Sequence, residues 1–299
     1  MSILVLGTTA LDTVTTPSGR RREMLGGSAV HFAMSASHFT RVDLVAVVGR
    51  DFPRRHIDFL RKKGVNVTAL TIEDGSTFRW EGAYRGDLNT ALTLSTQLGV
   101  LSTFRPRIAE RQRSIENIFL ANVDPDIQRH LLDRMRSPRL VGLDSMNFWI
   151  DHKRRSLVRL LKDVDIFVAN DAEARSLSGE THLIKAARGL RRMGAPMVVI
   201  KKGEHGVFVS FKDCFFCLPA YPVEKIVDPT GAGDTFAGGF MGYLATARKM
   251  NDAAIKKAIS YGTIMASFNV EGFGVERTAR LTKKDIVRRL ERFRDIVSF

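Results

Sequence analysis

Short apolar runs alternate with amphipathic runs along most of this chain, and this alternation restricts its fold more than any other feature. The apolar runs are rich in Val, Ile and Leu, which is typical of strands buried on both faces. They cover residues 2–7, 43–49, 118–124, 140–146, 165–170 and 197–203. Helical apolar spacing predicts helices over residues 52–64, 126–136, 151–163 and 182–194. The chain is therefore expected to form an α/β fold, with helices on both faces of a mostly parallel sheet.

Two segments depart from this alternation. Residues 71–103 are rich in Thr, aromatic residues and turn formers, and FRWEGAY within them alternates roughly, which predicts β structure lying off the main sheet. Residues 12–25 separate the first predicted strand from Gly26 and Gly27. Since no internal repeat or long linker interrupts the pattern, we expect a single domain over residues 1–299.

Composition limits the function classes. A chain of 299 residues with 44% hydrophobic content can bury a substantial core. No apolar run is long enough to cross a bilayer, and MSILVLGTTALD enters a strand-like pattern without a basic region or a cleavage site. We expect a soluble, cytoplasmic protein with no membrane partner.

The formal net charge of +14 is compatible with nucleic acid, an anionic membrane or anionic substrates as partners. The basic residues are mixed with helical apolar spacing, as in residues 279–294, where Ile286, Leu290 and Phe293 recur on one face. This pattern is typical of a solvated helix surface. Without a nucleic-acid fold signature, we expect no nucleic-acid partner.

Cys214 and Cys217 form a lone CxxC pair. A second CxxC or a His pair at ligand spacing would indicate a zinc site, but the sequence has neither, and the flanks predict a strand. We expect no metal or redox role for this pair.

The stretch DPTGAGDTFAGGF, residues 228–240, combines glycines and aspartates directly before a predicted helix. Free N–H groups at a helix start bind anions, and glycine permits a close approach, so Gly231, Ala232 and Gly233 are candidate phosphate ligands. Asp234 would repel a phosphate that is merely bound. Its position makes sense if it accepts a proton from a hydroxyl group that attacks the phosphoryl group. The simpler alternative is that Asp234 caps the helix.

The helix that follows contains costly glycines. Phe236, Phe240 and Leu244 recur at intervals of four and predict one packed face. Gly238, Gly239 and Gly242 each cost roughly 1 kcal/mol relative to alanine in a helix, which predicts close packing against a neighbour or a ligand. The Walker, dinucleotide-binding and protein-kinase motifs are absent.

These residues resemble the ribokinase-like kinases of the phosphofructokinase B type. DPTGAGDTFAGGF is similar to the C-terminal signature of that family almost letter for letter. Further matches, in family order, are Asp12, Gly26-Gly27, Asn170 to Glu173, and the KKGEHG run from Lys201 to Gly206. The resemblance implies a three-layer α/β/α fold with a small β lid formed by roughly residues 12–25 and 72–98.

The resemblance also implies roles for single residues. Asp234 would be the catalytic base, and Gly231, Ala232 and Gly233 would form the anion hole. The acceptor would be bound by Asp12, Gly26, Gly27, His31 and Trp80. ATP would be bound by Asn170, Glu173, Lys201, Gly203, Gly206 and Thr230. Asn170 and Glu173 would act on Mg²⁺ through water, and Asp228 and Thr230 could form a K⁺ site with Gly272 or Gly274.

Several of these residues have simpler explanations. Asn170 and Glu173 could be only a strand end and a helix cap. Gly203 and Gly206 could be hairpin glycines, and Asp12 a turn residue. The sequence also departs from the family where His31 replaces the usual asparagine, and where Asp144-Ser-Met-Asn147 replaces the common DPN segment.

Together these features predict an ATP-dependent kinase that phosphorylates a primary hydroxyl group of a small carbohydrate. A nucleoside kinase is the alternative, supported by His31 and by aromatic residues that could either stack on a base or only pack, namely Phe78, Trp80, Tyr84 and Trp149. An inactive nucleotide-binding regulatory or nucleic-acid-binding protein is a third possibility, which the intact site residues argue against. The resemblance also allows a homodimer formed through the lid.

Overall fold

The computed structural model describes residues 1–86, 88–212 and 214–298. Its main sheet contains β1 (Ser2–Leu6), β4 (Arg41–Gly49), β5 (Val65–Glu73), β8 (Asn117–Leu120), β9 (Leu140–Asp144), β10 (Ile166–Asn170), β11 (Met197–Lys201), β12 (Val207–Phe211) and β13 (Cys214–Leu218). The strand order is β13-β12-β11-β10-β9-β8-β1-β4-β5. The pairs from β5 to β11 are parallel, whereas β12 is antiparallel to both of its neighbours.

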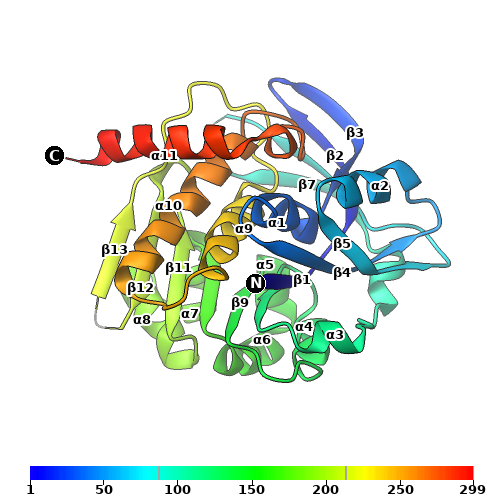
Figure 1. The fold of residues 1–299 in the computed structure, drawn as a ribbon, viewed down its shortest axis with the longest axis horizontal. Helices are drawn as coiled ribbons and strands as arrows, with labels where there is room; N and C mark the ends of the chain where they lie inside the picture. The colour runs from blue at the N-terminus through cyan, green and yellow to red at the C-terminus, as the bar shows by residue number, and fades with distance from the viewer. Residues whose placement is uncertain (87, 213, 299) are drawn as a thin grey trace.

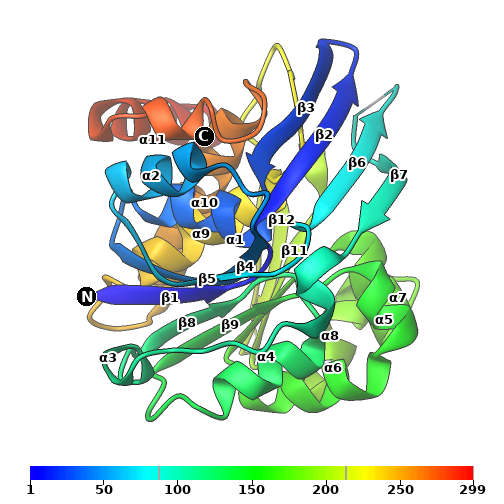
Figure 2. The same ribbon diagram turned by 90° about the vertical axis from the view of Figure 1, so that its right-hand side faces the viewer.

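Helices cover both faces of this sheet (Figure 1, Figure 2). One face carries α1 (Ser28–Ala36), α2 (Arg54–Lys62), α9 (Ala232–Leu244) and α10 (Asp252–Asn269), with α11 (Lys283–Val297) packed on α10. The other carries α4 (Pro125–Leu132), α6 (Arg154–Leu160), α7 (Asp171–Ser178) and α8 (Leu183–Met193), beside the short α3 (Glu110–Arg113) and α5 (Asn147–His152). Strand β1 shows the two-sided burial, because Ile3 and Val5 join one core and Leu4 and Leu6 the other. The predicted three-layer α/β fold is confirmed.

Some expected boundaries are wrong. Residues 71–73 belong to the main sheet, because Val48 pairs with Ile72 and Gly49 with Glu73 in the parallel β4–β5 ladder. The strand expected over 118–124 ends at Leu120. The helix expected over 151–163 is divided into the end of α5, the whole of α6 and a 3₁₀ turn over Leu161–Asp163. Cys214 and Cys217 lie on the predicted strand, as free and exposed thiols.

A second sheet stands off the main one. It consists of β2 (Ala10–Thr16), β3 (Gly19–Gly26), β6 (Arg79–Tyr84) and β7 (Ala91–Gln97), in the order β3-β2-β6-β7. Figure 2 shows its strands projecting past the main sheet. The β structure expected off the main sheet is present in these strands. Its action as a lid and the single-domain boundary stay predictions.

Helix α9 lies unusually close to its neighbours. A Cβ on Gly238 would overlap the carbonyl oxygen of Phe32 in α1, and one on Gly242 would lie 3.0 Å from the Cα of Ala36. On the α10 side, a Cβ on Gly239 would lie 2.8 Å from the Cγ of Met265. The glycines therefore let backbones touch, which confirms the predicted close packing.

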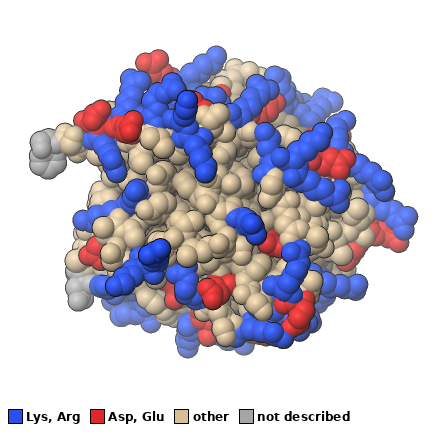
Figure 3. Space-filling model, in the orientation of Figure 1, with Lys and Arg blue, Asp and Glu red and all other residues tan. Residues whose placement is uncertain are grey.

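Charge is spread over the surface. On the face drawn in Figure 3, Lys and Arg side chains lie around the periphery, interleaved with acidic ones, and the centre is largely uncharged. Within residues 1–86, 88–212 and 214–298, no helix combines the length and hydropathy that crossing a bilayer requires. The absence of a nucleic-acid partner stays a prediction.

The contact between α9 and α1 makes a stability prediction. Gly238→Ala should destabilise the protein by ~1–3 kcal/mol, because the new methyl group meets the backbone of Phe32, which cannot move aside as a flexible side chain would. This destabilisation is the net effect, because the cost of the clash should exceed the ~1 kcal/mol that alanine gains over glycine in a helix. Urea unfolding followed by circular dichroism measures the change. A matched control is Gly189→Ala in α8, where the nearest atom would be at 3.4 Å; a Gly238→Ala variant as stable as this control would contradict the prediction.

Candidate active site

Two predicted site residues, Asn170 and Lys201, lie at the carboxyl ends of parallel strands beside Asp144, which was not predicted. Asp144 ends β9, Asn170 ends β10 and Lys201 ends β11. The order in which strands are added to the sheet reverses between β1 and β8. The strands β4 and β5 follow on one side of β1, and β8 to β13 follow on the other side. Open α/β sheets bind their ligands at such a switch point, above the carboxyl ends of the strands.

Asp12 lies on β2 and reaches the start of α1. Its Oδ2 accepts a hydrogen bond of 3.2 Å from the N–H of Gly27, and a Cβ on Gly26 would overlap its carboxylate. Burial raises the pKa of Asp12 to about 7; the Gly27 hydrogen bond opposes this shift, and the charges of Asp228 and Asp234 add to it. Asp12 is a strand residue, so its interpretation as a turn residue is wrong.

The loop before α9 is held by Asp228, a buried carboxylate. Its two oxygens accept hydrogen bonds from the N–H groups of Thr230, at 2.9 Å, and Gly274, at 3.1 Å. Gly231, the N-cap residue of α9, follows with a φ of 71°, in the left-handed region that favours glycine. The N–H of Ala232 donates to the carbonyl oxygen of Pro229. Within the described part of the chain, the N–H groups of Gly231 and Gly233 have no such acceptor and are the ones available to an anion.

His31 is buried between α1 and this loop. A Cβ on Gly231 would overlap the imidazole ring, so the bare backbone lies against the face of the ring. Nδ1 lies 3.2 Å from Oδ1 of Asn269, whose Nδ2 donates to the carbonyl oxygen of Thr230. Burial lowers the pKa of His31, against the opposing effects of Asp228 and Asn269. The Nε2 atom is buried without a hydrogen-bond partner among the described residues.

Asp234 lies in the first turn of α9 but does not cap it. The N-cap residue of α9 is Gly231, and Asp234 is the third residue of the helix, so the interpretation of Asp234 as a simple N-cap is wrong. Burial raises the pKa of Asp234 to about 7; Asp144 raises it further, and Lys201 lowers it. A carboxyl group that titrates near neutral pH is suited to accepting a proton.

Lys201 connects the acidic residues of the site. Its Nζ lies 2.9 Å from Oδ2 of Asp144, and a Cβ on Gly233 would lie 2.9 Å from the same Nζ. Burial alone would lower the pKa of Lys201, but the carboxylates of Asp144, Glu173 and Asp234 outweigh it and raise the pKa. The ammonium group therefore stays charged beside the exposed backbone of the glycine loop.

Asn170 and Glu173 form a capping box at the start of α7. The N–H of Glu173 donates to Oδ1 of Asn170, and the N–H of Asn170 donates to Oε2 of Glu173, both at 2.7 Å. The simpler explanation for Asn170 and Glu173, a strand end and a helix cap, therefore accounts for the hydrogen bonds between them. Burial and the charge of Asp144 also raise the pKa of Glu173 to about 7, against Lys201, so Glu173 belongs electrostatically to the site.

The second sheet touches the site at separate points. The hydroxyl groups of Thr230 and Tyr84 are 3.4 Å apart, and burial raises the pKa of Tyr84 to about 12. Asn89 Nδ2 donates to Glu204 Oε1 in the 3₁₀ turn Gly203–His205, where Gly203 has a φ of 56°. Gly206 ends this turn with φ of 83°, between the antiparallel β11 and β12, as a hairpin glycine does. Trp80 lies on β6, paired in register with Asp12.

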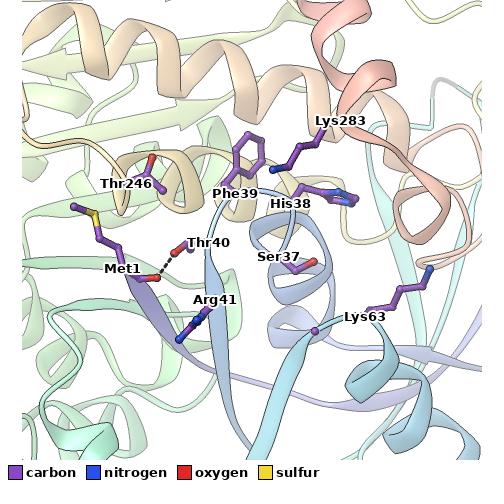
Figure 4. Close-up of a pocket in the computed structure, with 10 residues that line it drawn as sticks. Met1, Ser37, His38, Phe39, Thr40, Arg41, Lys63, Thr246 and Lys283 are labelled. Carbon is purple, nitrogen blue, oxygen red and sulfur yellow. Dashed lines mark hydrogen bonds between the residues drawn. The ribbon is translucent and has the colours of Figure 1, made fainter.

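A pocket of ≈ 560 Å³ lies elsewhere, at the amino ends of β1 and β4 (Figure 4). Its lining includes Met1, Arg41, Lys63 and Lys283, and the hydroxyl group of Thr40 donates to the carbonyl oxygen of Met1. Because the strands are parallel, this pocket lies at the amino ends of the strands, whereas Asp234 and Lys201 lie at their carboxyl ends. None of the predicted site residues lines it.

The model of the pfkB carbohydrate kinase family matches residues 5–280. This chain belongs to the pfkB family of carbohydrate kinases. Membership confirms the predicted family and the predicted enzyme class, a phosphotransferase that uses an alcohol group as acceptor.

Individual relatives extend this result. The chain is 32% identical over 259 residues to the cytidine kinase of Thermococcus kodakarensis, which covers 84% of this chain and 91% of that protein. The structure resembles the nucleoside kinase of Methanocaldococcus jannaschii, with a TM-score of 0.79 and 21% identity over 97% of this chain and 98% of that one. It also resembles the aminoimidazole riboside kinase of Salmonella enterica, solved with aminoimidazole riboside and an ATP analogue, with a TM-score of 0.75 and 20% identity over 97% and 100% of the chains. These structural likenesses support the fold.

Sequence reasoning missed two residues that organise the site. Asp144 was noted only as part of a departure from the family, although its place at the end of a predicted strand was a usable signal. Asn269, the last residue of α10, links His31, Thr230 and Thr235 through its side chain. No sequence pattern pointed to Asn269, because its partners are distant along the chain.

The buried carboxyl groups predict how stability depends on pH. Their raised pKa values mean that the folded state holds protons that the unfolded state releases, so their contribution to stability falls as pH rises from about 4 to 7. Asp12→Asn removes one such group. At pH 8 it should raise the free energy of unfolding by at least ~1 kcal/mol and therefore raise the melting temperature, whereas at pH 5 it should have little effect on either quantity.

Asp285→Asn is the control for this experiment. Asp285 accepts from the N–H of Thr282 in a capping box, and its pKa is lowered by the Thr282 hydrogen bonds. Its substitution should lower the melting temperature at both pH values. Scanning calorimetry measures both variants, and an Asp12→Asn protein less stable than wild type at pH 8 would contradict the prediction.

Proposed function

We propose that this protein is an ATP-dependent kinase that phosphorylates the hydroxymethyl group of a nucleoside. The observation that carries the chemistry is a half-buried carboxyl group with a raised pKa, Asp234, beside uncapped helix N–H groups and a lysine ammonium group. The match to a cytidine kinase across most of both chains favours a nucleoside over a free sugar. A small sugar such as ribose is the second candidate, because the family is one of carbohydrate kinases.

On the acceptor side, the proposal assigns binding to the buried groups at the start of α1. Asp12 would accept hydrogen bonds from ribose hydroxyl groups. Gly26 leaves the space that the Asp12 carboxylate occupies, and Gly27 lets the chain pass close to the backbone of Thr8, so both glycines would position the acceptor site. Nε2 of His31, buried and unpaired among the described residues, is a further candidate for an acceptor hydroxyl group. These contacts would hold the hydroxymethyl group near Asp234.

In the chemical step, Asp234 would take the proton of the acceptor's hydroxymethyl group, while the oxygen of that hydroxymethyl group attacks the γ-phosphorus of ATP. The bond from that phosphorus to the bridging oxygen breaks, and ADP carries away the electron pair. The N–H groups of Gly231 and Gly233 and the ammonium group of Lys201 would stabilise the charge on the transferred phosphoryl group. The N–H group of Ala232 already donates to the carbonyl oxygen of Pro229, so it would contribute to the anion hole only through a shared hydrogen bond.

The residues present fit ATP with Mg²⁺. Gly233 leaves the backbone bare beside Lys201, as a phosphate site requires, and Gly203, Gly206 and Thr230 would flank the nucleotide. Among the described residues, no group of three His, Cys, Asp or Glu is arranged to hold a metal directly. Mg²⁺ commonly keeps several waters and uses few carboxylates, so binding by Asn170 and Glu173 through water fits this site. When bound, the ion neutralises charge on the phosphates. The K⁺ site at Asp228, Thr230 and Gly272 or Gly274 stays a prediction.

Substitution of the base tests the mechanism. Asp234→Asn should lower kcat for ADP release with cytidine by about 10²–10⁴-fold and leave the Kd for ATP largely unchanged, because only the proton acceptor is removed. The matched control is Asp285→Asn, since both aspartates occupy the third position of a helix. Asp285→Asn should keep the wild-type kcat. If Asp234→Asn also kept the wild-type kcat, Asp234 would not be the base.

The pH profile tests the surroundings of the base. With a pKa of about 7 for Asp234, kcat/KM should rise through neutral pH as the carboxyl group loses its proton. Asp144→Asn removes a negative charge that raises this pKa and leaves Lys201, which lowers it. The rise should therefore move to lower pH in Asp144→Asn, whatever its maximal rate. A profile that moved to higher pH would contradict this arrangement.

A panel assay separates the remaining alternatives. Release of ADP from Mg-ATP with nucleosides and with free sugars identifies the acceptor class. No turnover with any of them, together with tight DNA or RNA binding, would support the inactive binding protein instead. The homodimer and the cytoplasmic location stay predictions.

A further inference from the structure

Trp80 lies on the face of the second sheet that carries Asp12. The parallel β2–β6 ladder pairs Asp12 with Trp80 and Val14 with Gly82, and paired residues point to the same side of a sheet. Asp12 and Val14 are buried, whereas Thr13 between them is only half-buried. The indole therefore belongs to the side of the sheet that Asp12 turns toward the start of α1.

The indole ring of Trp80 lies against Gly82, two residues further along the same strand. A Cβ on Gly82 would overlap the Cη2 and Cζ2 atoms of Trp80, so the ring crosses directly over the Gly82 backbone. Its Nε1 donates a hydrogen bond of 3.2 Å to Oγ1 of Thr93, which pairs with Gly82 across the β6–β7 ladder. Glycine below the ring and threonine at its edge thus hold the indole in one orientation.

Among the described residues, the indole ring has no aromatic or cationic stacking partner. The residue is also partly exposed, so a ligand can reach it. The phenyl and phenol rings near it do not share this arrangement: Phe78 packs against the core, and Tyr84 contacts Thr230 through its hydroxyl group.

We propose that Trp80 is the stacking platform for the nucleobase of the acceptor, and that this platform makes the enzyme select nucleosides over free sugars. The inference rests on the proposed function for the placement of the ribose at Asp12. Neighbouring strands are about 5 Å apart, so a ribose at Asp12 would carry its base toward the next strand, where Trp80 lies at the same register. A flat indole face suits a planar heteroaromatic ring, and a free sugar offers it no such surface.

Kinetics with two acceptors test the platform. In Trp80→Leu, the KM for cytidine should rise roughly tenfold to hundredfold, and the KM for D-ribose should stay within about twofold of wild type. Trp80→Phe, which retains an aromatic face, should lie between them. The matched control is Leu92→Thr on β7, because Leu92 pairs with Ala83, adjacent to Gly82, and is 53% exposed. Leu92→Thr should leave both KM values unchanged.

Variants that keep the indole test its orientation. Thr93→Val removes the hydrogen bond to Nε1, and Gly82→Ala displaces the ring, so both should raise the KM for cytidine and spare that for ribose. Tryptophan fluorescence reports binding without turnover. Cytidine, but not ribose, should quench the emission of wild type, and Trp80→Leu should abolish this quenching.

The outcomes separate this inference from the proposed function. If Trp80→Leu raised the KM for cytidine and for ribose equally, or if cytidine still quenched its emission as in wild type, the platform would be wrong even in an active kinase. If wild type turned over no nucleoside or sugar, the proposed function would fail. Quenching by cytidine that depends on Trp80 would still support the platform in that case.

Discussion

The contact between α1 and α9 is the constraint on which the site depends. Gly238 and Gly242 let the two helix backbones touch at Phe32 and Ala36, so the starts of both helices lie side by side. One start carries Gly27, which donates to Asp12, and the other carries Gly231, which lies against His31. A side chain at Gly238 would separate the helices and with them the proposed acceptor and phosphate sites. The stability lost to glycine in α9 therefore positions the chemistry.

The site concentrates charge where water is scarce. Asp12 and Glu173 are buried and Asp234 is half-buried, and all three have raised pKa values. One lysine, Lys201, is paired with Asp144 beside them. An arrangement of this kind lowers the stability of the folded state at neutral pH, because unpaired carboxylates are desolvated. It also gives a proposed base that can hold or release a proton near pH 7. Active sites commonly combine these two properties.

The second sheet brings the acceptor-side features together. Asp12, Trp80 and Tyr84 lie on its strands, and the hydroxyl group of Tyr84 reaches Thr230 in the loop before α9. Asn89, after β6, contacts the turn at Glu204. Recognition of the base by Trp80 would thus use the same sheet that contacts the proposed phosphate-binding loop before α9. Closure of the sheet and selection of the acceptor would then be linked.

The sequence alone determined the layered α/β fold, the glycine-rich loop before α9 and the position of Asp234 in the first turn of that helix, because strand and helix periodicities and the glycine motif are local patterns. It also determined that α9 must pack closely, since the cost of its glycines is a local property. Tertiary structure decided the rest. Only the fold shows that Asp234 is not the N-cap residue, that Asp144 pairs with Lys201, that Asn269 joins His31 to Thr230, and that the indole of Trp80 occupies the space a side chain at Gly82 would take. Each of these depends on residues far apart in the chain, whose approach is set by packing between layers and by strand register.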